Sequence, residues 1–199
     1  ADIMMHTMER YFVLEDTMEI TDKIAQDVMK NVMKYAKILK KDPENYEARA
    51  EIMWCGSLSH NGLTGCGTCG GDWATHLIEH ELGGMFDVAH GAGLAAVWGS
   101  WARYVMDEKP ERFAQFAVDV MGVEESDDVK STALKGIEAV EEFYRMIEMP
   151  TNMKELGINP TDEQIKDMAM KATNHDTQQL GAFKKLSAKD LVEIYKTAK

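Results

Sequence analysis

The chain has 199 residues, of which 45% are apolar, and a formal net charge of -12. This is enough for one globular domain with a substantial core, and no stretch reaches the roughly 18 apolar residues of a membrane span. An acidic surface repels nucleic acid and anionic membranes, so we expect neither as a partner. Three clustered cysteines, at positions 55, 66 and 69, are too few for a disulfide framework, which predicts a cytoplasmic protein.

Helical periodicity extends over most of the chain. From residue 2 to residue 12, apolar side chains recur at i, i+4, i+7 and i+8, which predicts an amphipathic helix. Further helices are expected over residues 21–40, 45–63, 73–82, 94–106, 110–121 and 127–148, and after the capping-box sequences that begin at Thr161 and Ser187. Gly83 and Gly84 are expected to end the helix that starts at Trp73. No segment alternates with the period of a strand, so the sequence predicts a single all-α, bundle-like domain over residues 1–199.

Histidines are concentrated in one part of the sequence. His76, His80 and His90 fall within fifteen residues, and the first two are spaced i, i+4 on a predicted helix. Asp2 and His6 have the same spacing on the first predicted helix, so each pair shares a helix face. One carboxylate with several imidazoles suits Fe²⁺, Zn²⁺ or another divalent metal, and four protein ligands leave a coordination position open. The residues therefore indicate a catalytic metal centre.

Other patterns in the same region leave alternatives open. His76, Glu79 and His80 form H-x-x-E-H, the inverted zinc-protease motif, although this interpretation leaves the remaining histidines and Asp2 unexplained. The G-x-G-x-x-G sequence of residues 65–70 follows a predicted helix where a dinucleotide site requires a strand. The C-x-x-C pair inside it has no second pair, and we interpret both cysteines as loop thiols. His60 and His175 lie outside the cluster and are expected to be structural or surface residues.

Several segments resemble a known family. They are Asp2-Ile-Met-Met-His6-Thr-Met-Glu-Arg-Tyr-Phe, Pro43-Glu-Asn-Tyr-Glu-Ala-Arg-Ala, Asn61-Gly-Leu, Trp73-Ala-Thr-His76, His80-Glu-Leu, Pro150-Thr-Asn-Met-Lys-Glu-Leu-Gly, Gln179-Leu-Gly and Ile194-Tyr-Lys-Thr-Ala. In order and spacing these segments resemble the iron-containing alcohol dehydrogenases, and among them the butanol dehydrogenases. The resemblance covers essentially the whole chain.

The resemblance implies a role for each residue of the cluster. Asp2, His6, His76 and His90 match the family's four metal ligands, and His80 matches a histidine close to the nicotinamide and the substrate. The implied fold is the helical C-terminal half of a two-domain, dehydroquinate synthase-like architecture. The family's NAD(P)-binding α/β domain is expected to be absent from this chain, which implies that the isolated chain is inactive.

The leading hypothesis is therefore a metal-dependent alcohol dehydrogenase domain. Joined to its cofactor domain, it would transfer hydride between a small alcohol or aldehyde and NAD(P). The sequence leaves open whether the protein forms a homo-oligomer. The alternatives are a non-catalytic metal-binding or subunit-contact domain, since hydride transfer requires a cofactor site, and a zinc hydrolase of the H-x-x-E-H type. The loop with Cys66 and Cys69 departs from the family pattern and leaves the substrate open.

Overall fold

The computed structural model describes residues 1–16 and 18–199, and it confirms the predicted all-α fold. In these residues the only β pairing is an isolated antiparallel bridge between Leu180 and Leu186. None of the helices described has the length and apolar character needed to cross a membrane. The helices are α1 (Asp2–Tyr11), α2 (Glu19–Lys41), α3 (Tyr46–His60), α4 (Ala74–Phe86), α5 (His90–Val105), α6 (Pro110–Asp119), α7 (Val129–Met146), α8 (Asp162–Ala172) and α9 (Ala188–Ala198), with 3-10 turns at η1 (Leu63–Gly65) and η2 (Met106–Glu108).

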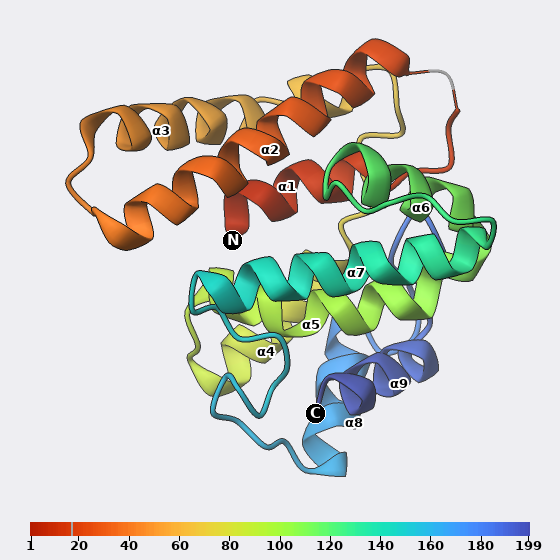
Figure 1. Cartoon of the computed structure of the whole chain (residues 1–199). Coiled ribbons are helices and arrows are strands. Elements are labelled where there is room, and N and C mark those ends of the chain that lie inside the picture. The colour runs from red at the N-terminus through yellow and green to blue at the C-terminus, as the bar shows by residue number, and fades with distance from the viewer. Residues whose placement is uncertain (17) are drawn as a thin grey trace.

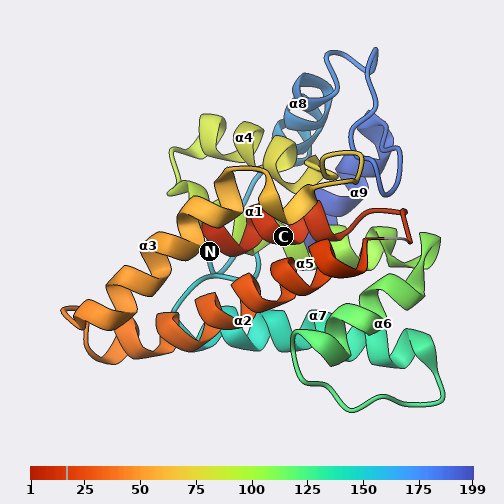
Figure 2. The same cartoon turned by 90° about the horizontal axis from the view of Figure 1, so that it is seen from above.

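The helices form two groups that meet at α1 and α5 (Figure 1). One group is the antiparallel pair α2 and α3, against which α1 packs, as the view from above shows (Figure 2). In the other group α5 packs against α4, α7 and α9, while α8 contacts both α4 and α9. The first residues of the chain lie close to the start of α5, where a Cβ at Gly91 would be 3.6 Å from the Cβ of Ala1.

The core is built around α5, which is apolar on most of its circumference. Trp98 and Trp101 are fully buried, and the ring of Phe12 packs between these residues and α6, stacked on Phe113 with ring centroids 4.3 Å apart. Burying large aromatic side chains is the main driving force for a helical domain of this size. This aromatic core holds the C-terminal end of α1 against α5, and it thereby positions the N-terminal end of α1.

Helices begin and end at the predicted positions where the sequence has capping residues. Thr161 and Gln164 form a reciprocal capping box at the start of α8, and Ser187 and Asp190 form another at the start of α9, as predicted. Pro110 begins α6, which ends shortly before Gly122 at a left-handed φ of 71°.

The prediction for Gly83 and Gly84 was wrong, because α4 continues through both residues to Phe86. The helix ends instead at Asp87, whose φ is 52°. Two glycines weaken a helix by roughly 1 kcal/mol each, but the packing of α4 against α5 and α8 outweighs this local preference. The next helix also begins earlier than expected, so that His90 is its first residue.

Candidate metal centre

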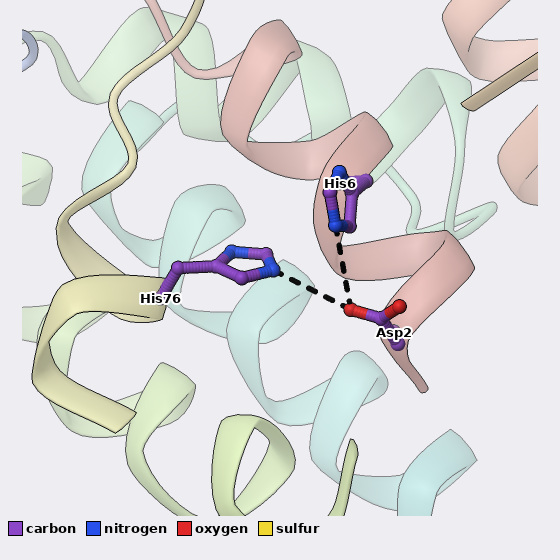
Figure 3. Close-up of side chains that lie close together, drawn as sticks. All are labelled: Asp2, His6 and His76. Atoms are coloured by element: carbon purple, nitrogen blue, oxygen red, sulfur yellow. Dashed lines mark ion pairs between the residues drawn. The ribbon is translucent and has the colours of Figure 1, made fainter. Parts of the chain in front are cut away.

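The predicted metal ligands converge on one carboxylate oxygen. Oδ1 of Asp2 lies 3.6 Å from Nε2 of His6, 3.4 Å from Nε2 of His76 and 3.5 Å from Nε2 of His90. Figure 3 shows the rings of His6 and His76 directed at this same oxygen. The structure thus brings together all four residues, which come from α1, α4 and α5.

Their positions follow from the helices that carry them. Asp2 and His6 are one turn apart on α1, so their side chains point the same way. His76 lies in the first turn of α4, and His90 begins α5 after a connection of three residues, 87 to 89. The contact of α1 with α5 then brings Asp2 and His6, from the first helix, close to His90 at the start of α5.

A buried glutamate orients His76. Glu9 has 0% of its surface exposed; its Oε1 accepts the backbone N–H of His76 at 3.1 Å, and its Oε2 accepts the ring Nδ1–H. In the neutral ring, which is the form that binds a metal, the carboxylate holds the proton on Nδ1, so the lone pair of Nε2 faces Asp2. Glu9 lies three residues after His6 and seven after Asp2, on the same face of α1. That spacing is the signal by which the sequence could have identified it.

A second buried glutamate orients His90 in the same way. Oε2 of Glu79 accepts a hydrogen bond from Nδ1 of His90, and Glu79 is 1% exposed. Two glycines make room for its carboxylate: a Cβ at Gly93 would lie 2.5 Å from Oε1 of Glu79, and one at Gly83 would lie 3.0 Å away. Gly83, expected to break the helix, instead packs against the group that positions His90.

The start of α4 is held by a buried aspartate. Oδ1 of Asp72 accepts the backbone N–H of Ala74, while Oδ2 accepts those of Ala182 and Phe183 at 2.7 and 2.8 Å. Burial raises the pKa of Asp72 to about 6, although these three hydrogen bonds oppose the shift. The next residue, Trp73, lies edge-on to His76, with ring centroids 5.5 Å apart.

The ionisation of the cluster is strongly coupled. Contact with His76 lowers the pKa of Asp2 far below its usual range, whereas burial lowers the pKa of His6 to about 4. Burial also opposes the charge of His76, but the neighbouring carboxylates of Asp2 and Glu9 outweigh it and raise the pKa to about 9. Burial raises the pKa of Glu79. These opposing shifts are typical of a site that holds positive charge next to a carboxylate.

The geometry fits a divalent cation. Oδ1 of Asp2 and Nε2 of His76 are both buried, lie 3.4 Å apart and lack a hydrogen-bond partner in the described residues, so a cation bound between them would satisfy both atoms. Two ligand atoms that each lie about 2.1 Å from one ion at a tetrahedral angle are about 3.4 Å apart. The observed separations of 3.4 to 3.6 Å match this value, and carboxylate with imidazole is a donor set for Fe²⁺ or Zn²⁺.

His80 lies beside this cluster. Its exposed ring is 6.1 Å from that of His76 and 5.6 Å from that of His90, measured between centroids. Within the H-x-x-E-H sequence, Glu79 is buried and engaged with His90, so it is not placed to activate a water molecule as a zinc protease requires. The geometry therefore opposes the hydrolase alternative.

His60 is exposed and bonded within its own helix, as expected of a surface residue, but the structure brings it closer to the cluster than its position in the sequence indicated. It is the last residue of α3, and its Nε2 lies 3.4 Å from Oδ2 of Asp2. No local pattern links residues 2 and 60, because their contact depends on how α3 packs against α1. His175 is exposed in the loop after α8, as expected.

Comparison with known proteins identifies one family over the whole chain. The family model described as Fe-containing alcohol dehydrogenase family, C-terminal, matches residues 1–199. The chain is 32% identical over 197 residues to NADH-dependent butanol dehydrogenase A of Clostridium acetobutylicum, a match that covers 98% of this chain and 50% of that protein. It is 30% identical over 200 residues to the NADPH-dependent aldehyde reductase YqhD of Escherichia coli, covering 100% of this chain and 50% of that protein.

Solved structures show the same relationship. The crystal structure of NADH-dependent butanol dehydrogenase A from Thermotoga maritima superposes with a TM-score of 0.90 and 34% identity, covering 99% of this chain and 50% of that one. The structure of Escherichia coli YqhD gives a TM-score of 0.92 with 28% identity, covering 100% and 50%. The chain spans about half the length of the proteins it matches.

Proposed function

The chain belongs to the iron-containing alcohol dehydrogenase family, as its C-terminal domain, and we propose that it is the metal-binding half of an NAD(P)-dependent alcohol dehydrogenase. The observation that carries this proposal is the convergence of three imidazole Nε2 atoms on Oδ1 of Asp2. A nucleotide-binding α/β domain outside these 199 residues would supply NAD(P). One relative is named for NADH and another for NADPH, so the proposal covers both cofactors.

The protein's own residues have distinct tasks in this scheme. Asp2, His6, His76 and His90 would hold the cation, while Glu9 and Glu79 keep two of the imidazoles in the tautomer that binds it. A bound divalent cation supplies Lewis acidity toward the oxygen of a small alcohol or aldehyde.

We assign substrate contact to His80. Its ring is exposed and its centroid lies 5.6 Å from that of His90, so it can contact the substrate or nicotinamide and exchange a proton with solvent. A bound NAD(P) would supply the hydride chemistry, and the residues of this chain would bind and orient the alcohol or aldehyde beside it.

Metal titration tests the centre directly. We expect one Fe²⁺ or Zn²⁺ per chain and a higher melting temperature, since a ligand at 100 times its Kd stabilises the folded state by about 2.7 kcal/mol. His76→Ala should abolish stoichiometric binding, whereas His175→Asn, which changes a histidine outside the cluster, should leave it intact. Full binding by the His76→Ala protein, or no binding by the wild type, would refute the assignment.

A second candidate function is a non-catalytic metal-binding or subunit-contact domain. It rests on the same convergence of imidazole nitrogens on Asp2, which can bind an ion without a nucleotide cofactor. NADH and NADPH would bind to a domain outside these residues, so the two candidates are distinguished after the chain is joined to a family nucleotide-binding domain. Alcohol oxidation by the chain joined to a family nucleotide-binding domain would support the dehydrogenase proposal.

A further inference from the structure

His6 is oriented differently from the other two imidazoles of the centre. Carboxylates hold the Nδ1 protons of His76 and His90, whereas Nδ1 of His6 is buried and has no hydrogen-bond partner in the described part of the chain. An imidazole ring without such a bond can turn about its Cβ–Cγ bond, because this torsion has broad minima. Turning would carry Nε2 of His6 away from Oδ1 of Asp2, which lies 3.6 Å from it. The orientation of this ring therefore depends on the side chains that pack around it.

Neighbouring rings pack around that of His6. The ring of His60 lies against it, with centroids 3.8 Å apart, while those of His76 and Trp73 are inclined to it by 75°, at 4.5 and 5.3 Å. Such aromatic contacts favour particular ring geometries, because the face and the edge of a ring carry opposite partial charges. The indole of Trp73 only donates hydrogen bonds and has no lone pair to offer a cation. Trp73 therefore acts on the centre through the histidines that it contacts.

Trp73 is itself held in one position. Its φ of 62° lies in the left-handed region, which a residue with a side chain adopts only where the surrounding structure enforces it. It follows Asp72, whose buried carboxylate holds the start of α4. The indole Nε1–H donates to the carbonyl oxygen of Gly70 at 3.0 Å, and a Cβ at Gly71 would lie 2.9 Å from Nε1. The structure thus fixes both the backbone and the ring of Trp73.

Arg10 connects Trp73 to the helix that carries His6. Its guanidinium carbon lies 4.7 Å from the centroid of the indole, where the ring attracts a cation. The same guanidinium donates to the carbonyl oxygens of His6 at 3.2 Å and of Ser59 at 2.5 Å. Arg10 lies about one turn after His6 on α1. The indole is therefore fixed relative to the turn of α1 that carries His6.

We propose that Trp73 is a positioning residue of the metal centre, which holds the ring of His6 with Nε2 directed at the cation. This inference rests on the proposed function, because it requires an ion at Asp2. Buried glutamates perform the same task for His76 and His90. A third buried carboxylate would add a desolvation cost, which an aromatic contact avoids. Trp73 thus restricts the ring of His6 without adding a charge.

The zinc affinity of the 199-residue chain, measured by competition with a chelator, tests this role. Trp73→Leu removes the aromatic ring and keeps an apolar side chain at the left-handed position. We expect its affinity to be about tenfold lower than that of the wild type, as when other groups that orient a metal ligand are removed. Trp73→Phe, which keeps an aromatic ring, should restore most of the affinity. Trp54→Leu removes an exposed indole on α3, and this matched control should bind as the wild type.

The ring nitrogens of the histidines give a readout that a general loss of folding would not reproduce. In the zinc-bound wild type with isotope-labelled histidine, Nε2 of His6, His76 and His90 should show the NMR shift of a metal-bound nitrogen. In Trp73→Leu the shift of His6 should move toward that of free imidazole, while those of His76 and His90 stay.

Arg10→Met is a milder variant that carries the test if Trp73→Leu does not fold. It removes the cation over the indole and keeps a long apolar side chain. The zinc affinity should fall by about two- to fivefold.

The outcomes separate this inference from the proposed function. Equal affinities of wild type and Trp73→Leu would overturn the role of Trp73 and leave the four-residue centre standing. A lower affinity with equal changes at His6, His76 and His90 would also overturn it, since Trp73 would then only support the fold. If Trp73→Leu does not fold, an unchanged affinity of Arg10→Met decides against the inference. Failure of the wild-type chain to bind Zn²⁺ would overturn both this inference and the proposed function.

Discussion

The two sides of the histidine cluster differ in their access to solvent. On the inner side, the side chains of His76 and Glu9 are 8% and 0% exposed. On the outer side, those of His90 and His60 are both 43% exposed. A buried polar pair is rigid and costly to disrupt, whereas an exposed imidazole can exchange protons and admit a small molecule. The difference indicates that the inner side maintains the geometry of the centre and that the outer side is open to solvent and small molecules.

The largest effect is expected from breaking the inner pair. Glu9→Ala leaves the Nδ1–H and backbone N–H of His76 without their acceptor in a buried environment. Removal of one partner of a buried pair costs about 3 to 5 kcal/mol, which urea denaturation of the metal-free protein would measure. Glu44→Ala, at an exposed position, is the control and should change stability by less than about 0.5 kcal/mol. Equal stability of Glu9→Ala and Glu44→Ala would remove the distinction between the two sides.

A smaller loss is expected from crowding the partner of His90. Gly93→Ala places a Cβ 2.5 Å from Oε1 of Glu79, so that carboxylate must move. Overpacking of this kind costs about 1 to 3 kcal/mol. Gly84→Ala is the matched control, because a Cβ there meets nothing within 4 Å and should stabilise α4 by about 0.5 to 1 kcal/mol. Thermal unfolding of both variants gives the comparison, and stabilisation by Gly93→Ala would contradict the packing argument.

The charge of Glu79 is tested by a nearly isosteric change. Glu79→Gln keeps an oxygen that can accept the hydrogen bond from Nδ1 of His90 but loses the negative charge. We expect the affinity for Fe²⁺ or Zn²⁺, measured by competition with a chelator, to fall about tenfold. An unchanged affinity would show that only the hydrogen bond, and not the charge, orients His90.

The smallest effect on the centre is expected from His80. His80→Ala should change stability by less than about 0.5 kcal/mol and leave metal affinity unaltered, because the ring is exposed and lies outside the predicted ligand set. When the variant is joined to a nucleotide-binding domain, alcohol oxidation should fall. Loss of metal binding by the isolated variant would instead show that His80 is a metal ligand, and the proposed ligand set would then be wrong.

The sequence by itself determined the fold class and most of the helices. Apolar periodicity identified the helices, and the capping boxes at Thr161 and Ser187 gave the starts of the last two. Spacing placed Asp2 with His6 and His76 with His80, and the family resemblance grouped the four predicted ligands. These features are readable because a helix fixes the relative direction of residues three and four apart.

Only the tertiary structure decided which helix faces meet. Local glycine propensity predicted an end to α4 at Gly83, yet packing carries the helix on to Phe86. Glu9 lies on the same face as Asp2, but its contact with His76 exists only because α1 packs beside the start of α4. His60 reaches Asp2 in the same way, through the packing of α3 on α1. Periodicity specifies the face of a helix on which a residue lies, and long-range packing specifies what that face contacts.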